Sequence, residues 1–107
     1  MTPSMTTLTE AFETTVLQWP HTEKRNMMGG LCYMAKGKMF ATIRDGLVLT
    51  KLSDEERQEL EKIHPFKPFQ HGKRVLKKWA HMTITPEELE KVHLYIKKSY
   101  ETALKQA

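Results

Sequence analysis

The chain has 107 residues, 39% of them hydrophobic and 28% charged, with a formal net charge of +4. This length predicts one domain over residues 1–107, with a single core that needs neither disulfides nor metal. Residues 1–6 are expected to be flexible. No apolar run is long enough to predict a transmembrane helix. The first residues do not resemble a signal peptide. Cys32 is the only cysteine, which favours a protein of the reducing cytoplasm.

The first predicted helix runs from Leu8 to Gln18. Thr7 lies directly before the helix and Glu10 lies in its first turn. Their spacing is that of a capping box, in which each side chain accepts a hydrogen bond from the backbone amide of the other residue. Its apolar residues recur at helical spacing and predict one buried stripe: Leu8, Phe12, Val16 and Trp19. Pro20 ends the helix, and residues 21–26 are expected to be a polar connector.

Three strands and two tight turns are predicted next, at residues 27–35, 38–44 and 47–52. Asp45-Gly46 is the stronger turn signal, because both central residues of a type I′ turn need positive φ, and Lys36-Gly37 is a weaker one. Alternation along the middle strand turns one wholly apolar set toward the core: Met39, Ala41 and Ile43. The same alternation places Phe40 on the opposite face.

A second helix is predicted to begin after Ser53, which forms a capping box with Glu56, and to end near His64. Residues 65–73 contain two prolines and predict a loop. Four apolar side chains of this region are expected to face the body of the domain: Leu60 and Ile63 from the helix, and Phe66 and Phe69 from the loop.

The last predicted elements are a strand over residues 75–84, around Trp79, and a helix that reaches about Lys105. The helix opens with a cap, a proline and a capping-box glutamate at residues 85–88. Its buried stripe is predicted to be Leu89, Val92, Ile96, Tyr100 and Ala103. The order α-β-β-β-α-β(-β)-α, with short connections among the first strands, predicts an α+β two-layer sandwich on a mainly antiparallel sheet. The first and last helices are expected to cover one face.

The charge is unevenly distributed along the chain. Residues 1–61 carry 7 basic and 9 acidic side chains, residues 62–107 carry 10 basic and 4 acidic ones, and no acid lies between Lys62 and Pro86. A field of this sign attracts phosphate, nucleic acid or acidic protein surfaces. The side chains that would bind nucleic acid are Lys67, Lys73, Arg74, Lys77 and Lys78.

Two interpretations of this basic tract stay open. Cations near the rings of Phe66, Phe69 and Trp79 could track a single strand of nucleic acid. Alternatively the rings belong to the core and the lysines only solvate an edge strand and keep it from pairing wrongly. Strand alternation would turn Lys78 away from Lys77 and so divide the patch, which favours the second interpretation.

No residue pattern indicates catalysis, a metal site or a cofactor. Gly29-Gly30 is interpreted as a turn or bulge, because no helix follows it to hold a phosphate. Cys32 is interpreted as a buried structural thiol. The methionines of the strand region are interpreted as core residues: Met27, Met28, Met34 and Met39. The histidines of the basic tract lack the short spacing of metal ligands: His64, His71 and His81.

Over roughly residues 20–105 the chain resembles the TfoX/Sxy N-terminal domain family. The resemblance rests on a glycine pair, an unaltered Gly-Lys-Met-Phe-Ala block, a Leu-x-Leu-x-Lys strand, a proline and phenylalanine segment, and a late tryptophan. The matching residues are Met27, Gly29, Gly30, Gly37, Lys38, Met39, Phe40, Ala41, Leu47, Leu49, Lys51, Phe66, Pro68, Phe69 and Trp79. Met28 stands where the family usually has phenylalanine. The part from Trp79 to Tyr100 is also similar to the MmcQ/YjbR family, whose members share a two-layer fold and are often described as DNA-binding.

The resemblance implies a compact α+β domain without catalytic residues in a regulatory setting, because TfoX/Sxy proteins act in natural competence as activators of transcription. The expected function is therefore a non-enzymatic regulatory or protein-interaction module in the cytoplasm. The alternative is direct nucleic-acid binding through the basic tract at residues 62–78. The expected partners are a protein, nucleic acid, or a second copy of the chain through an exposed strand edge, with no membrane and no cofactor.

Overall fold

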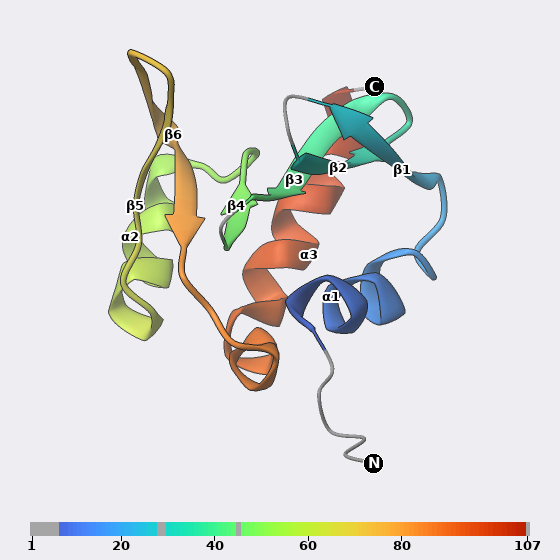
Figure 1. The fold of residues 1–107 in the computed structure, drawn as a ribbon, viewed down its shortest axis with the longest axis horizontal. Coiled ribbons are helices and arrows are strands. Elements are labelled where there is room, and N and C mark those ends of the chain that lie inside the picture. Colours follow the sequence, from blue (N-terminus) through green and yellow to red (C-terminus); the bar gives the residue numbers. More distant parts are fainter. Residues whose placement is uncertain (1–6, 28–29, 45, 107) are drawn as a thin grey trace.

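The computed structural model describes residues 7–27, 30–44 and 46–106, so the expectations for residues 1–6, Met28, Gly29 and Asp45 lie outside the described residues. Within them the chain is an α+β domain, as predicted, with an antiparallel sheet in the order β1-β2-β3-β4-β6-β5 (Figure 1). The elements are α1 (Leu8–Val16), β1 (Thr22–Met27), β2 (Gly30–Ala35), β3 (Lys38–Ile43), β4 (Leu47–Leu49), α2 (Asp54–Ile63), β5 (Lys67–His71), β6 (Arg74–Met82), the 3₁₀ turn η1 (Pro86–Glu88) and α3 (Leu89–Gln106).

All three predicted helix starts are confirmed, because their signals are local. The Thr7 and Ser53 hydroxyls each accept a hydrogen bond, at 3.1 Å, from the amide of the glutamate three residues later. The amide of Thr85 donates to Glu88 Oε1 at 2.9 Å, ahead of the short 3₁₀ turn that leads into α3. Of the stripe predicted for the last helix, Val92, Ile96, Tyr100 and Ala103 are buried, as are Tyr95 and Ser99. Leu89 is half-buried against the core.

Two strands occupy segments that were predicted as connections. β1 takes up the expected polar connector at residues 21–26, and β5 lies within the expected loop at residues 65–73. Both predictions are wrong for the same reason. These are the two edge strands of the sheet, and an edge strand forms through backbone hydrogen bonds to one neighbour without needing an apolar alternation of its own. The strand predicted at residues 47–52 also ends earlier, at Leu49.

The predicted turn at Lys36-Gly37 is confirmed. Lys36 has φ 50° and Gly37 has φ 82°, as a two-residue type I′ hairpin between β2 and β3 requires. At the second predicted turn Gly46 has φ 121°. The other central residue predicted for that turn, Asp45, lies outside the described residues.

α1 and α3 lie on one face of the sheet (Figure 1). A row of fully buried residues crosses four strands beneath them, because partners across antiparallel strands share a face: Tyr33, Ala41, Leu49 and Ala80. α2 packs beside α3 and contributes Leu60 to the core. Ile63, predicted on the inner side of this helix, is instead 46% exposed, because it is the last helical residue.

A β-bulge corrects the predicted orientation of Phe40. The pairing changes from Tyr33↔Ala41 to Met34↔Met39, which leaves Phe40 as an extra residue on β3. Phe40 is fully buried, and its ring centroid lies 5.5 Å from that of Tyr100 on α3. Met39, predicted to face the core, is half-buried and lies outside the core cluster.

A polar contact joins α1 to the sheet. The Tyr33 hydroxyl donates to Glu13 Oε2 at 2.7 Å, and Lys24 Nζ lies 3.1 Å from the same oxygen. Burial alone would raise the pKa of Glu13, but the hydrogen bonds from Tyr33 and Lys24 and the Lys24 charge outweigh it and hold that pKa below its usual value. The ionised carboxylate is therefore the form that stabilises the fold.

We expect Glu13→Gln to lower the free energy of unfolding by about 1–2 kcal/mol at neutral pH, because two charge-assisted hydrogen bonds are weakened. A depressed folded-state pKa gives stability that is present above the unfolded pKa and is lost as the pH falls through the folded value. The difference between the two proteins should therefore shrink below pH ~4. Urea unfolding at neutral and acidic pH measures it, with Glu61→Gln on α2 as the control. A difference that is independent of pH would contradict this account.

Candidate functional site

β5 and β6 form a hairpin that extends beyond the rest of the sheet (Figure 1). β4 pairs with β6 only from Ala80 to Met82, and residues 74–76 pair with β5 alone. The β5 register shifts between Pro68 and Phe69, which leaves residues 77–79 of β6 as an irregular stretch. The turn at the tip contains Gly72, whose φ is 63°. The hairpin is thus a two-stranded ribbon rooted in the sheet at one end.

The side chains predicted to bind nucleic acid all lie on this hairpin and all are exposed: Lys67, Lys73, Arg74, Lys77 and Lys78. The turn brings Lys73 and Arg74 together at the tip. Lys67 is at the opposite end of β5, in register with His81. Lys78 instead lines a hollow together with Lys51, Glu56 and Thr102 of α3. Across the described part of the chain, none of these five cations forms an ion pair.

The aromatic residues of the hairpin pack on one another. Phe69 is 4% exposed, stacks on Trp79 with 5.7 Å between ring centroids, and meets His81 edge-on at 5.5 Å. Phe66 is half-buried against the core. Phe66 therefore faces the body of the domain as predicted, whereas the ring contacts of Phe69 are with residues of β6.

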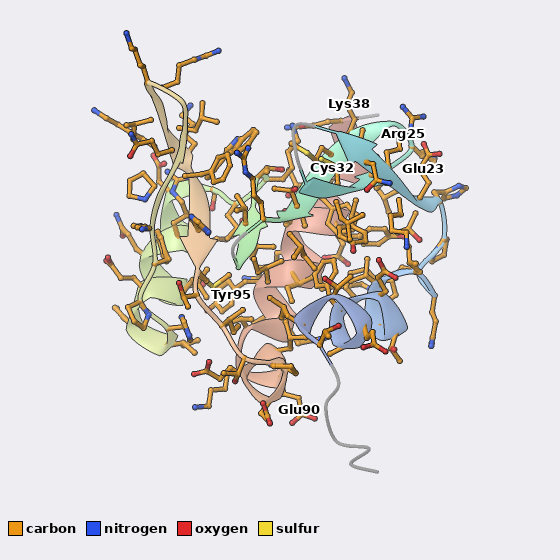
Figure 2. The ribbon with its side chains drawn as sticks, in the orientation of Figure 1. Glu23, Arg25, Cys32, Lys38, Glu90 and Tyr95 are labelled. Atoms are coloured by element: carbon orange, nitrogen blue, oxygen red, sulfur yellow. The ribbon has the colours of Figure 1, made fainter. Side chains whose placement is uncertain are left out.

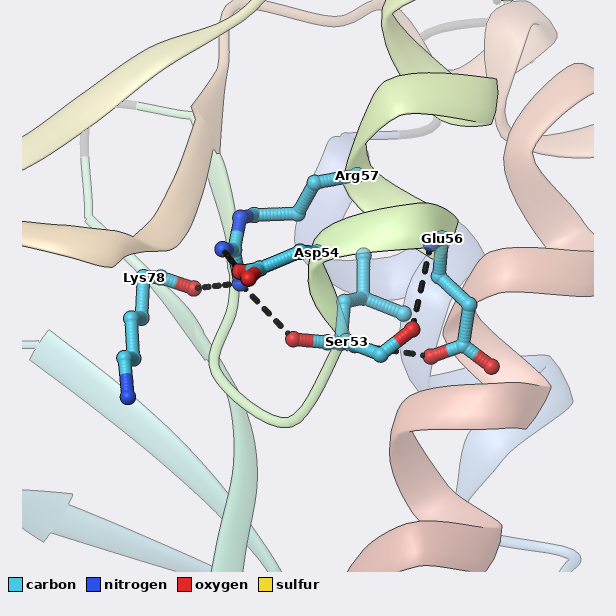
Figure 3. Close-up of polar contacts among 6 residues, drawn as sticks. Ser53, Asp54, Glu56, Arg57 and Lys78 are labelled. Carbon is cyan, nitrogen blue, oxygen red and sulfur yellow. Dashed lines mark hydrogen bonds and ion pairs between the residues drawn. The ribbon is translucent and has the colours of Figure 1, made fainter.

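Arg57 fixes the root of the hairpin to α2 (Figure 3). Its guanidinium donates to the carbonyl oxygen of Leu52 at 2.8 Å and to that of Lys78 at 3.2 Å, and it pairs with Asp54. The side chain is 14% exposed. Sequence reasoning missed Arg57, because an arginine in the first turns of a polar helix looks like any surface residue until β6 is placed beside it.

A second feature is an apolar hollow of about 260 Å³ between α1 and the first turns of α3. It is lined mainly by Phe12, Thr15, Val16, Leu89 and Ile96, with Glu90 and His93 as its titratable groups. Glu90 is exposed near the start of α3 (Figure 2). Beside the hollow, His93 meets the ring of Trp19 at 5.8 Å, and Lys97 Nζ lies 4.6 Å from the same ring centroid. No local sequence signal marks this hollow, because its two walls come from opposite ends of the chain.

Five of the matched family residues have contacts that serve the fold. Phe40, Ala41 and Leu49 are core residues. The amide of Lys51 donates to Ser99 Oγ at 3.2 Å. A Cβ at Gly30 would lie 2.9 Å from the carbonyl oxygen of Ile43, so the close approach of two strands requires glycine there.

Cys32 and His64 are both buried, at different places in the fold. Cys32 is buried, as expected, and is not in a disulfide. His64 is buried, with Nδ1 2.9 Å from the carbonyl oxygen of Pro65 and Nε2 3.6 Å from Glu88 Oε2. In residues 7–27, 30–44 and 46–106 no three His, Cys, Asp or Glu side chains are grouped to hold a metal ion. No helix in these ranges is long and apolar enough to cross a bilayer.

Comparison with known proteins adds one finding. Residues 15–106 match the family model described as the TfoX N-terminal domain. The search of curated proteins found no match.

Proposed function

The chain belongs to the TfoX N-terminal domain family, and from this membership we propose that it is a non-catalytic regulatory domain that binds another protein in the hollow between α1 and α3. The family is associated with the regulation of competence. We place this role in the cytoplasm, because a sequence with a single cysteine, Cys32, is typical of a reducing compartment.

The observation that carries the proposal is the size and lining of the hollow. Its volume of about 260 Å³ is at the lower end of the roughly 300–1,000 Å³ of small-molecule clefts. It suits one bulky apolar side chain, and such an anchor in a dry pocket supplies much of the binding energy of many protein interfaces. Phe12, Val16 and Ile96 are part of the core, so the floor of the hollow is rigid.

The charge at the hollow indicates the chemistry of the partner. Glu90 is the one carboxylate among the described residues that line the hollow, and Glu87 is exposed in the turn before it. The nearby cation, Lys97, lies over the ring of Trp19 beside the hollow. A partner that carries Lys or Arg next to its apolar anchor would complement this rim. The proposed occupant is therefore a peptide segment with a Trp, Phe or Leu beside a basic residue.

Selection of random 12-residue peptides against the intact domain tests the proposal. We expect enrichment of an aromatic or leucine anchor next to Lys or Arg. Thr15→Trp fills the hollow and Glu90→Lys reverses its charge, and each should weaken the selected peptides at least about tenfold, which is 1.4 kcal/mol. Glu101→Lys, an exposed charge reversal further along α3, is the matched control and should leave the affinity unchanged.

Urea unfolding of each variant checks that the domain remains folded. Peptides that bind the Thr15→Trp variant as tightly as the unaltered chain would overturn the proposed site. Turnover of a metabolite by the purified protein would overturn the non-catalytic role.

A further inference from the structure

We infer that the β5–β6 hairpin is a nucleic-acid-binding ribbon that enters the major groove of duplex DNA through its tip. This goes beyond the proposed protein-binding role, because it concerns a different surface and a different class of partner. It rests on the charge of the hairpin, on its shape and on the placement of its rings.

The exposed charge of the hairpin is entirely positive. Lys73 and Arg74 lie at the tip and Lys77 lies further down β6, each exposed and without an ion pair. No acidic residue occurs in the sequence between Lys62 and Pro86. On α2, Asp54 is paired with Arg57, and Glu56 lines a hollow beside Lys78 rather than the tip of the hairpin. Phosphate groups can therefore approach the hairpin without meeting a carboxylate on it.

The shape of the hairpin fits a groove. Two paired strands are about 4.8 Å apart, and the major groove of B-DNA, about 12 Å wide, admits a two-stranded ribbon. Residues 74–76 pair with β5 alone, and residues 77–79 form an irregular stretch between the two registers of the hairpin, so the outer part of the ribbon is free of the remaining sheet (Figure 1). Arg57 holds the root at Lys78 and would keep the ribbon oriented as it docks.

The rings favour a duplex over a single strand. Proteins that track single strands stack bases on exposed aromatic faces. Phe69 is 4% exposed and lies against both Trp79 and His81, so its ring is already used within the domain. Val75, 51% exposed next to Arg74, offers instead an apolar contact of the kind that meets a thymine methyl group in the major groove.

Fluorescence anisotropy with the full chain tests the inference, using a labelled 20-base-pair DNA duplex and one of its strands at about 50 and 200 mM salt. Three phosphate contacts, by Lys73, Arg74 and Lys77, predict a slope of about −2.7 in log affinity against log salt, so the duplex Kd should rise about 40-fold over this range. We expect the duplex to bind at least about tenfold tighter than the single strand.

A matched pair of double variants locates the site. Lys73→Ala with Arg74→Ala removes two cations from the tip and should reduce the salt slope by about 1.8. Lys91→Ala with Lys105→Ala removes the same charge from exposed positions on α3 and should change the slope little. Thr15→Trp, which fills the hollow, should leave duplex binding unchanged and so separates this inference from the proposed function.

Three results would overturn the inference. The first is tighter binding of the single strand than of the duplex. The second is displacement of the duplex by poly-glutamate at equal charge concentration, which would indicate an acidic protein as the partner. The third is an equal loss of duplex binding in the two double variants, which would make the effect one of net charge.

Discussion

Gly46→Ala is expected to destabilise the domain by roughly 4 kcal/mol, near the upper end for a single substitution. Gly46 has φ 121°, a conformation that costs an L residue of order 1–3 kcal/mol. A Cβ there would also lie 2.3 Å from the carbonyl oxygen of Met82 and 3.2 Å from its carbonyl carbon. These are backbone atoms of β6, so relief of the clash would require β4 and β6 to separate where Leu47 pairs with Met82.

Urea unfolding followed by far-ultraviolet circular dichroism measures this effect, and Gly72→Ala provides the matched control. Gly72 also has a positive φ, 63°, but an added Cβ meets no atom within 4 Å. Its substitution should cost only the conformational penalty, about 1–2 kcal/mol. Equal losses in the two variants would show that the contact with Met82 contributes nothing.

Phe40→Ala is expected to cost about 3–5 kcal/mol, the usual range for removing a buried aromatic ring from a core. Phe40 is fully buried under α3, with its ring edge-on to Tyr100 at 5.5 Å. Its carbonyl oxygen accepts a hydrogen bond of 2.6 Å from Ser99 Oγ, so the surrounding backbone is held and cannot collapse readily into the cavity. The same urea titration measures the loss.

Met39→Ala is the control for Phe40, because simple strand alternation predicts the opposite order of effects for these neighbours. Met39 is half-buried outside the core cluster and should cost about 1 kcal/mol or less. A larger loss for Met39→Ala than for Phe40→Ala would contradict the bulge at Tyr33/Met34 and restore the regular alternation.

The basic hairpin was partly predictable from the sequence and the hollow was not. The cations lie close together along the chain, so their shared segment was visible before folding. Their arrangement at a projecting tip depends on β5, a strand that forms only because β6 is present to pair with it. The hollow requires Thr15 and Glu90 to meet across α1 and α3, and nothing near either residue in the sequence indicates the other.

By itself the sequence determined the features that depend on a few neighbouring residues. These are the three helix starts, the type I′ turn at Lys36-Gly37 and the α+β order with its antiparallel sheet. Only the tertiary structure decided the edge strands β1 and β5, the burial of Phe40 and the hydrogen bond by which Arg57 joins α2 to β6. The physical reason is the same throughout: caps and turns satisfy backbone groups locally, whereas edge pairing, bulges and helix–helix hollows gain their free energy from partners distant in the chain.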